Sequence, residues 1–166
     1  RTAEAVLDLA GPAPSPAALA GLLSVQQALS ALDRLEVRGR DSAGVHLLVT
    51  DHGLDLDAPA VANLLDARTG DALFTSGTVR HPSGSLAFVY KAAAEIGELG
   101  DNTRALRDAI RADALLRLAL DNDTAQTLVL GHTRWASVGI ISQPNAHPLD
   151  SEELGGSVGP YVTAVL

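Results

Sequence analysis

Thr127-Leu128-Val129-Leu130-Gly131 is a continuous apolar run that leads directly into His132-Thr133-Arg134-Trp135-Ala136-Ser137-Val138-Gly139. A compact apolar run of this length predicts a buried strand. The residues after it then lie at the end of that strand, where loops carry the groups that bind and react. We therefore expect a sheet with a functional loop at the end of this strand.

A helix is predicted from about residue 16 to residue 37, because Ser15 and Pro16 form a start signal. Its buried stripe recurs at helical spacing and consists of Leu22, Val25, Leu29 and Leu32. Its exposed face is predicted to carry Gln26, Gln27, Ser30, Asp33 and Arg34.

A second long helix is predicted from Asp101 to about Leu120, because Asp101, Asn102 and Thr103 can cap its start. Its buried stripe is expected to be Ala105, Ala109, Ala112, Leu116 and Ala119. Strands are expected at Val45–Val49, Leu86–Tyr90 and Tyr161–Leu166. The pattern is weak between residues 50 and 85, where one short helix is expected.

The composition sets the class of protein. A chain of 166 residues that is 46% hydrophobic can bury one core, and with 3% aromatic residues and no Met that core consists of Ala, Leu and Val. Helices packed on a sheet, an α+β class, fit this composition. A net charge of −8 argues against a nucleic-acid partner.

Several other classes of site are also excluded by composition. The chain has no Cys, so disulfides and thiolate metal sites are not possible. It has no apolar run near twenty residues, so no membrane span is expected and the cytoplasm is the default location. Asp51, Asp55 and Asp57 lack the spacing of a calcium loop, so no metal site is predicted. Both ends of the chain resemble cut ends, so we expect a fragment of a longer polypeptide.

Arg134 is the candidate substrate anchor. A guanidinium binds a carboxylate through two parallel hydrogen bonds, and an amino-acid substrate needs such an anchor if its far end is to react. The alternative is a structural pair in which Arg134 stacks on Trp135. Physical chemistry alone favours the structural pair.

Three segments resemble one family. The first, residues 132–139, resembles the loop His-Thr-Arg-Trp-Ala-Thr-His-Gly of glucosamine-6-phosphate synthases. These enzymes carry a class II, N-terminal-nucleophile glutaminase domain. The loop matches at His132, Thr133, Arg134, Trp135, Ala136 and Gly139. The second is Asn145-Ala146-His147-Pro148, and the third is Leu35-Glu36-Val37-Arg38-Gly39-Arg40-Asp41-Ser42-Ala43-Gly44. The resemblance covers about 25–44 and 131–166 and leaves the middle unmatched.

The resemblance implies a four-layer αββα sandwich of the N-terminal-nucleophile hydrolase type, incomplete at both ends. It implies that Arg134 holds the α-carboxylate of glutamine, that Trp135 belongs to an element that covers the occupied site, and that Ser137 hydrogen-bonds substrate. Arg38 is implied to lie near the nucleophile and orient it. His132, Thr133 and His147 are expected to support the loop structurally, since a His before Pro is more often a structural residue than a proton donor.

The chain departs from the family in four respects. The nucleophilic N-terminal Cys and the oxyanion Asn-Gly pair are absent, so this fragment alone is expected to be inactive. Val138 stands where the family has His, and Val37 and Arg40 replace two Tyr residues. The separation of Arg38 from His132 is about twice that of an ordinary synthase, so residues 1–166 are expected to be one glutaminase domain fragment with an insertion within about 50–123.

For the parent protein the resemblance implies hydrolysis of glutamine to glutamate and ammonia, which a downstream isomerase domain transfers to fructose 6-phosphate. The implied partners are glutamine, that sugar phosphate and further copies of the parent in a homo-oligomer; no cofactor is implied. One alternative is the glutaminase domain of another class II enzyme, such as phosphoribosyl-pyrophosphate amidotransferase, asparagine synthetase or glutamate synthase. The other is an inactive glutaminase-like binding or scaffold module.

Overall fold

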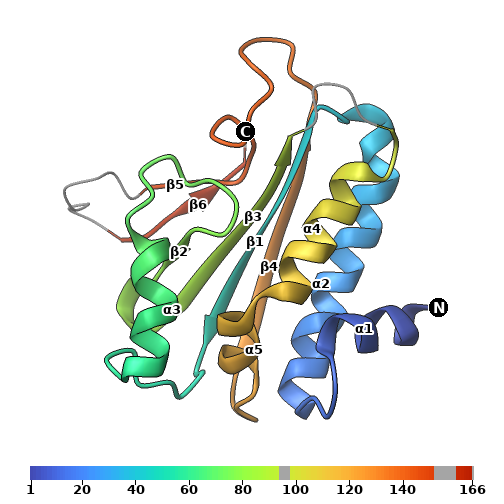
Figure 1. Ribbon diagram of the computed structural model, residues 1–166. Coiled ribbons are helices and arrows are strands. Elements are labelled where there is room, and N and C mark those ends of the chain that lie inside the picture. The colour runs from blue at the N-terminus through green and yellow to red at the C-terminus, as the bar shows by residue number, and fades with distance from the viewer. Residues whose placement is uncertain (94–97, 152–159, 166) are drawn as a thin grey trace.

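A computed structural model describes residues 1–93, 98–151 and 160–165 and shows helices packed on an antiparallel sheet (Figure 1). The α-helices are α1 (Thr2–Ala10), α2 (Pro16–Leu35), α3 (Pro59–Thr69), α4 (Asp101–Ala112) and α5 (Ala114–Leu120), and the 3-10 helices are η1 (Glu36–Arg38) and η2 (Pro82–Gly84). The strands are β1 (Ser42–Thr50), β2 (Val79–Arg80), β3 (Leu86–Ala93), β4 (Gln126–Arg134), β5 (Leu149–Asp150) and β6 (Thr163–Ala164).

The main sheet has the order β2-β3-β1-β4, and each neighbouring pair is antiparallel. In β1, Val45 pairs with Tyr90 of β3 on one side and with Gly131 of β4 on the other. Alternate side chains of β1 and β3 point toward α1, α2, α4 and α5 and form the core with them. The mixed α+β class and a strand over the apolar run Thr127–Gly131 are confirmed, but the prediction that this strand is buried is wrong, because β4 is at the edge of the sheet and Leu128 is 63% exposed.

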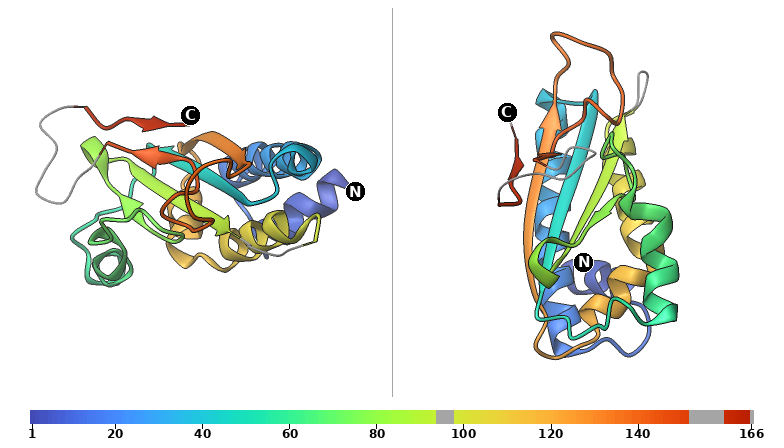
Figure 2. Two further views of the ribbon diagram at one scale, coloured as in Figure 1. Left: turned by 90° about the horizontal axis from the view of Figure 1, so that it is seen from above. Right: turned by 90° about the vertical axis from the view of Figure 1, so that its left-hand side faces the viewer.

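The outer face of the main sheet is covered by loops and by the two-stranded sheet β5-β6. His46 of β1 contacts both Tyr161 and Thr163, at 3.0 and 3.2 Å, so the segment that carries β6 lies against this face. In the right-hand view of Figure 2, β6 lies across the main sheet from α4 and α5. The described residues thus form a helical layer, a four-stranded sheet and a small second sheet.

The predicted helix 101–120 is wrong as one element, because it breaks at Asp113. This residue ends α4 and caps α5, where its Oδ1 accepts a hydrogen bond from the Leu116 amide at 3.0 Å. The break changes the buried face, so α4 buries Asn102, Leu106 and Ile110, while Ala105 and Ala112 are exposed and Ala109 is half-buried. Leu116 and Ala119 are buried as predicted.

The helix α2 has the predicted start and buried stripe, and Ser15 accepts a hydrogen bond from the Ala18 amide at 3.0 Å. Gln26 was predicted to be exposed and this is wrong, because α4 packs over it and Arg107 donates a hydrogen bond to its side chain. The helix α1 was not predicted. The strand expected at 161–166 is limited to β6, and Leu166 lies outside the described residues.

A polar cluster joins α3 to the core. Arg68 donates two hydrogen bonds to the Asp113 carboxylate at 2.9 and 2.6 Å, and the Tyr90 hydroxyl donates a third at 2.7 Å. Burial raises the pKa of Asp113, but the hydrogen bonds from Arg68 and its neighbours outweigh burial and hold that pKa below its usual value. Burial raises the pKa of Tyr90 well above its ordinary value.

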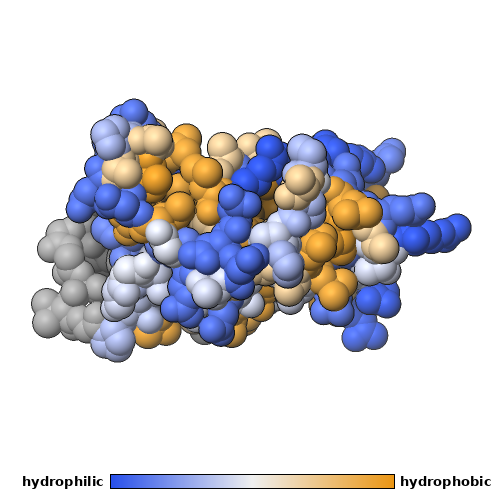
Figure 3. Space-filling view, turned by 90° about the horizontal axis from the view of Figure 1, so that it is seen from below, coloured by the Kyte–Doolittle hydropathy of each residue, from blue (hydrophilic) through white to orange (hydrophobic). Residues whose placement is uncertain are grey.

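The helical layer is loosely filled at its lower end. A cavity of about 200 Å³ lies between α1, α2 and α5, and its lining includes Leu9, Ala18, Leu22, Ile110 and Leu116. Figure 3, which views the molecule from this end, shows apolar residues reaching the surface between charged ones. Because the core is built mainly from Ala, Leu and Val, small side chains leave this space open.

Candidate functional site at the end of β1 and β4

The three motif segments meet at one end of the β1-β4 pair. Ser42 pairs with Arg134 and Gly44 pairs with His132, so the segment that follows α2 lies beside the His-Thr-Arg-Trp segment. The Asn-Ala-His-Pro segment crosses the same end of the sheet, since His147 lies directly on Gly44. Segments that are far apart in sequence thus form one site.

Arg38 lies in η1 and is exposed, and no hydrogen bond or ion pair of its side chain is recorded among the described residues. Its neighbour Gly39 has a φ of −166°, which is open to any residue. The close approach of β4 is the actual constraint, because a Cβ at Gly39 would lie 3.0 Å from the Thr133 hydroxyl oxygen and 3.2 Å from the Arg134 backbone. Thr133 therefore lies close against the segment that follows α2.

The side chain of Arg134 turns back onto the loop that follows it. Its Nη2 donates a hydrogen bond to the Val138 carbonyl oxygen at 2.6 Å. Trp135 is 65% exposed. Among the described residues its ring makes no cation–π contact with the Arg134 guanidinium, so the two side chains are not stacked. Ser137 is exposed, and its amide donates to the Trp135 carbonyl at 2.9 Å.

The two histidines of the site lie against each other. The ring centroids of His132 and His147 are 4.9 Å apart, and His132 Nδ1 is buried and has no hydrogen-bond partner within the described ranges. Burial, followed by the charges of His147 and Arg134, lowers the pKa of His132. A neutral His132 is therefore favoured, which fits packing of the loop better than a fixed positive charge.

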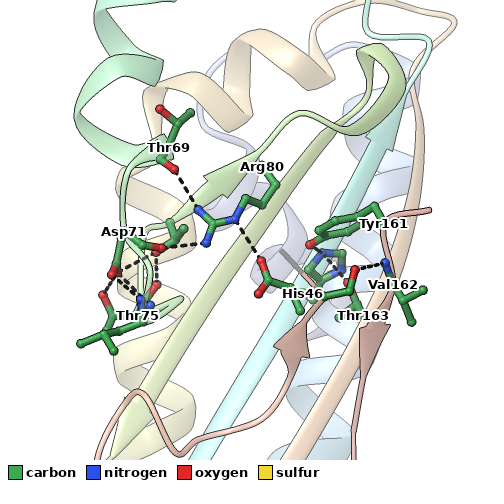
Figure 4. A network of polar contacts seen from close by, with 12 residues as sticks. His46, Thr69, Asp71, Thr75, Arg80, Tyr161, Val162 and Thr163 are labelled. Atoms are coloured by element: carbon green, nitrogen blue, oxygen red, sulfur yellow. Dashed lines mark hydrogen bonds and ion pairs between the residues drawn. The ribbon is translucent and has the colours of Figure 1, made fainter. Parts of the chain in front are cut away.

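A polar network that sequence reasoning missed holds the far end of the loop (Figure 4). Asp150 directly follows the loop in β5, and its carboxylate accepts a hydrogen bond from Arg80 at 3.0 Å, with both side chains 5% exposed. Arg80 also donates to the Thr69 and Asp71 carbonyls at 3.0 and 2.7 Å. No local pattern marks Arg80, because its partner is 70 residues away in the sequence.

Lys91 is a second buried cation on this face. It is 3% exposed, its Nζ has no hydrogen-bond partner among the described residues, and that atom lies 4.9 Å from the centre of the Phe74 ring. Burial lowers its pKa to about 8, although Asp150 and Asp71 oppose the change. Burial thus disfavours the charged form of Lys91.

The clearest chemical capacity of this site is the recognition of an anion. The sequence contains no Cys, and the part of the chain that the structure describes holds no group of three metal-ligating side chains. Within those same ranges, none of the helices has the length and apolar character needed to cross a bilayer. The Arg134 guanidinium can bind a carboxylate, because Arg offers five donors and one of them is engaged with Val138.

Comparison with known proteins gives one partial similarity. Over 38 residues, 23% of its length, the chain is 53% identical to the glutamine–fructose-6-phosphate aminotransferase (isomerizing) of Shouchella clausii (strain KSM-K16). The matched segment is 6% of that relative. No family model matches the chain, and no solved structure resembles it. A short segment of this chain is thus similar to a glutamine-dependent aminotransferase.

Proposed function

We propose that this chain is a glutaminase-like domain of a class II amidotransferase, with an enlarged middle within about residues 50–123. The observation that carries the proposal is the meeting of three separated motif segments at the end of β1 and β4. The partial similarity to an aminotransferase supports it. The four-layer fold of the family is part of the proposal, with the sheet β2-β3-β1-β4 as one of its two sheets.

In the proposed role, Arg134 binds the α-carboxylate of glutamine and Ser137 hydrogen-bonds the substrate. Arg38 orients a nucleophilic Cys that the parent polypeptide would supply, and Trp135 covers the occupied site. The parent would hydrolyse glutamine and pass ammonia to a sugar phosphate bound by an isomerase domain, and it would act as a homo-oligomer in the cytoplasm. The isolated chain binds glutamine and does not cleave it.

Glutamine titration followed by calorimetry tests this proposal. We expect saturable binding that falls by about 10- to 100-fold in Arg134→Met, because a charged hydrogen-bonded pair is lost. Arg104→Met is the matched control, since Arg104 is exposed and bonds only its helical neighbour Asp101 among the described residues. Absence of glutamine binding, or equal loss in both variants, would contradict the proposal.

An inactive binding module is the second candidate, favoured by Val138 at a position where the family has His and by the absence of Cys. Ammonia release by the intact parent polypeptide distinguishes the two. Glutamine binding together with ammonia release supports the glutaminase, whereas binding without release supports the module. Ammonia released by the isolated chain above the buffer background would show that the site contains a nucleophile that we have not assigned.

A further inference from the structure

The start of the candidate substrate loop is held by one carboxylate. Asp41 Oδ2 accepts a hydrogen bond from the Ala136 amide at 2.6 Å. The β1-β4 ladder ends with the pair Ser42 and Arg134, so this bond is the first link beyond the end of the sheet. A hydrogen bond to an ionised carboxylate is shorter and stronger than one between neutral groups, so a single bond can fix the backbone here.

The loop needs such a link because it has little packing of its own. Trp135, Val138 and Ile140 are 65%, 81% and 77% exposed, so their side chains do not anchor the loop in the core. Within residues 134–140, the internal contacts are the bond from Arg134 to the Val138 carbonyl and the backbone turn at Ser137, and Asn145 from the later part of the loop donates to the Ile140 carbonyl at 3.1 Å. These contacts lie within the loop itself, whereas Asp41 directly precedes β1 in the chain.

We infer that Asp41 is a positioning residue: its carboxylate fixes the backbone at Ala136 and thereby keeps the Arg134 guanidinium beside the proposed carboxylate site. The inference rests on the proposed function for the identity of the ligand. Asp41 does not touch the ligand and acts through Ala136. Removal of its carboxylate frees the Trp135–Gly139 segment without opening the core, because Asp41 is half-buried at the surface.

The sequence supplies a specific probe for this segment. Trp135 is the single Trp in the chain, so intrinsic tryptophan fluorescence reports on this loop alone. In Asp41→Ala we expect lower Trp135 anisotropy, stronger quenching by acrylamide, and at least a tenfold rise in hydrogen exchange at the Ala136 amide. The melting temperature should stay within about 2 °C of the original, since surface substitutions have small effects.

Asp41→Asn is the conservative variant, because its side-chain oxygen can still accept from Ala136, and it should restore most of the anisotropy and exchange protection. Asp33→Ala removes an exposed carboxylate from α2 and should change none of these quantities. Glutamine affinity should fall about tenfold in Asp41→Ala and less in Asp41→Asn.

The two proposals fail in different ways. If the original chain binds no glutamine, the proposed function is wrong, and the fluorescence and exchange measurements still test the hold of Asp41 on the loop. If Asp41→Ala leaves anisotropy and Ala136 exchange unchanged, the positioning role is overturned. It is also overturned if the loop is released but glutamine affinity stays the same.

Discussion

The carbonyl oxygen of His147 lies on Gly44 where a side chain would stand: a Cβ added to Gly44 would overlap that oxygen and lie 3.1 Å from Pro148 Cδ. The Asn-Ala-His-Pro segment can cross the sheet at this point only because β1 has no side chain there. The glycine therefore fixes the height of the loop above the sheet.

Gly44→Ala should displace the loop and destabilise the protein by about 2 kcal/mol, because the clash is with backbone rather than with a flexible side chain. Urea unfolding measures the loss. Gly70→Ala is the matched control, since nothing lies within 4 Å of its added Cβ and its φ is −86°. Equal stability of the two variants would show that the loop gives way without cost.

Asp113→Ala should cost about 3 to 5 kcal/mol, because it leaves Arg68 without its buried partner and removes the cap of α5. Tyr90→Phe removes one hydrogen bond to the same carboxylate and should cost about 1 kcal/mol. A double-mutant cycle by denaturant unfolding measures the coupling. Additive losses would mean that Tyr90 and Asp113 do not share a network.

His46 should make stability fall in mild acid. Burial lowers its pKa to about 4 from 6.5, so between these values the unfolded chain binds a proton that the folded chain does not. The free energy of unfolding therefore keeps its whole value above pH 6.5. As the pH falls from 6.5 toward 4 it decreases by about 3 kcal/mol. His46→Gln should lack this decline, and unfolding at pH 7 and pH 4.5 measures the difference. Parallel pH profiles would contradict the assignment.

Lys91→Met should stabilise the protein at pH 7.5 by about 2 kcal/mol, because it removes a buried cation whose Nζ has no hydrogen-bond partner in the part of the chain that the structure describes. With a folded pKa of about 8 and an unfolded one of 10.5, the original protein gains stability as the pH rises through this window. The advantage of the variant should therefore shrink by pH 9.5. An advantage that grows with pH would show the opposite shift in the pKa of Lys91.

Ala18→Leu should fill part of the cavity below the helical layer and stabilise the protein by about 1 kcal/mol. Thermal unfolding measures the gain, and Ala105→Leu on the exposed face of α4 is the control. Loss of stability in Ala18→Leu alone would mean that the cavity walls cannot accept the added volume.

The local pattern of apolar residues predicted helices and strands correctly where that pattern was regular or continuous. The stripe Leu22 to Leu32 of α2 was identified because its buried residues repeat at helical spacing, and β4 was identified as a strand because it contains a continuous apolar run. The break at Asp113 was missed, since a row of Ala residues continued the helical period across it. The contacts that place the loop were also missed, because Arg80 and Asp150 lie far apart in the chain and neither belongs to a motif.

The central place of β1 has a consequence for how the chain reaches its native state. During synthesis β1 emerges early, but its partner on one side is β4, which comes after α3, β2, β3, α4 and α5. Until then one edge of β1 has no strand to pair with, and Gly131 must find Val45 across a long stretch of chain. Such distant pairing slows folding, so this domain should fold in milliseconds or longer rather than at the speed of a helical bundle.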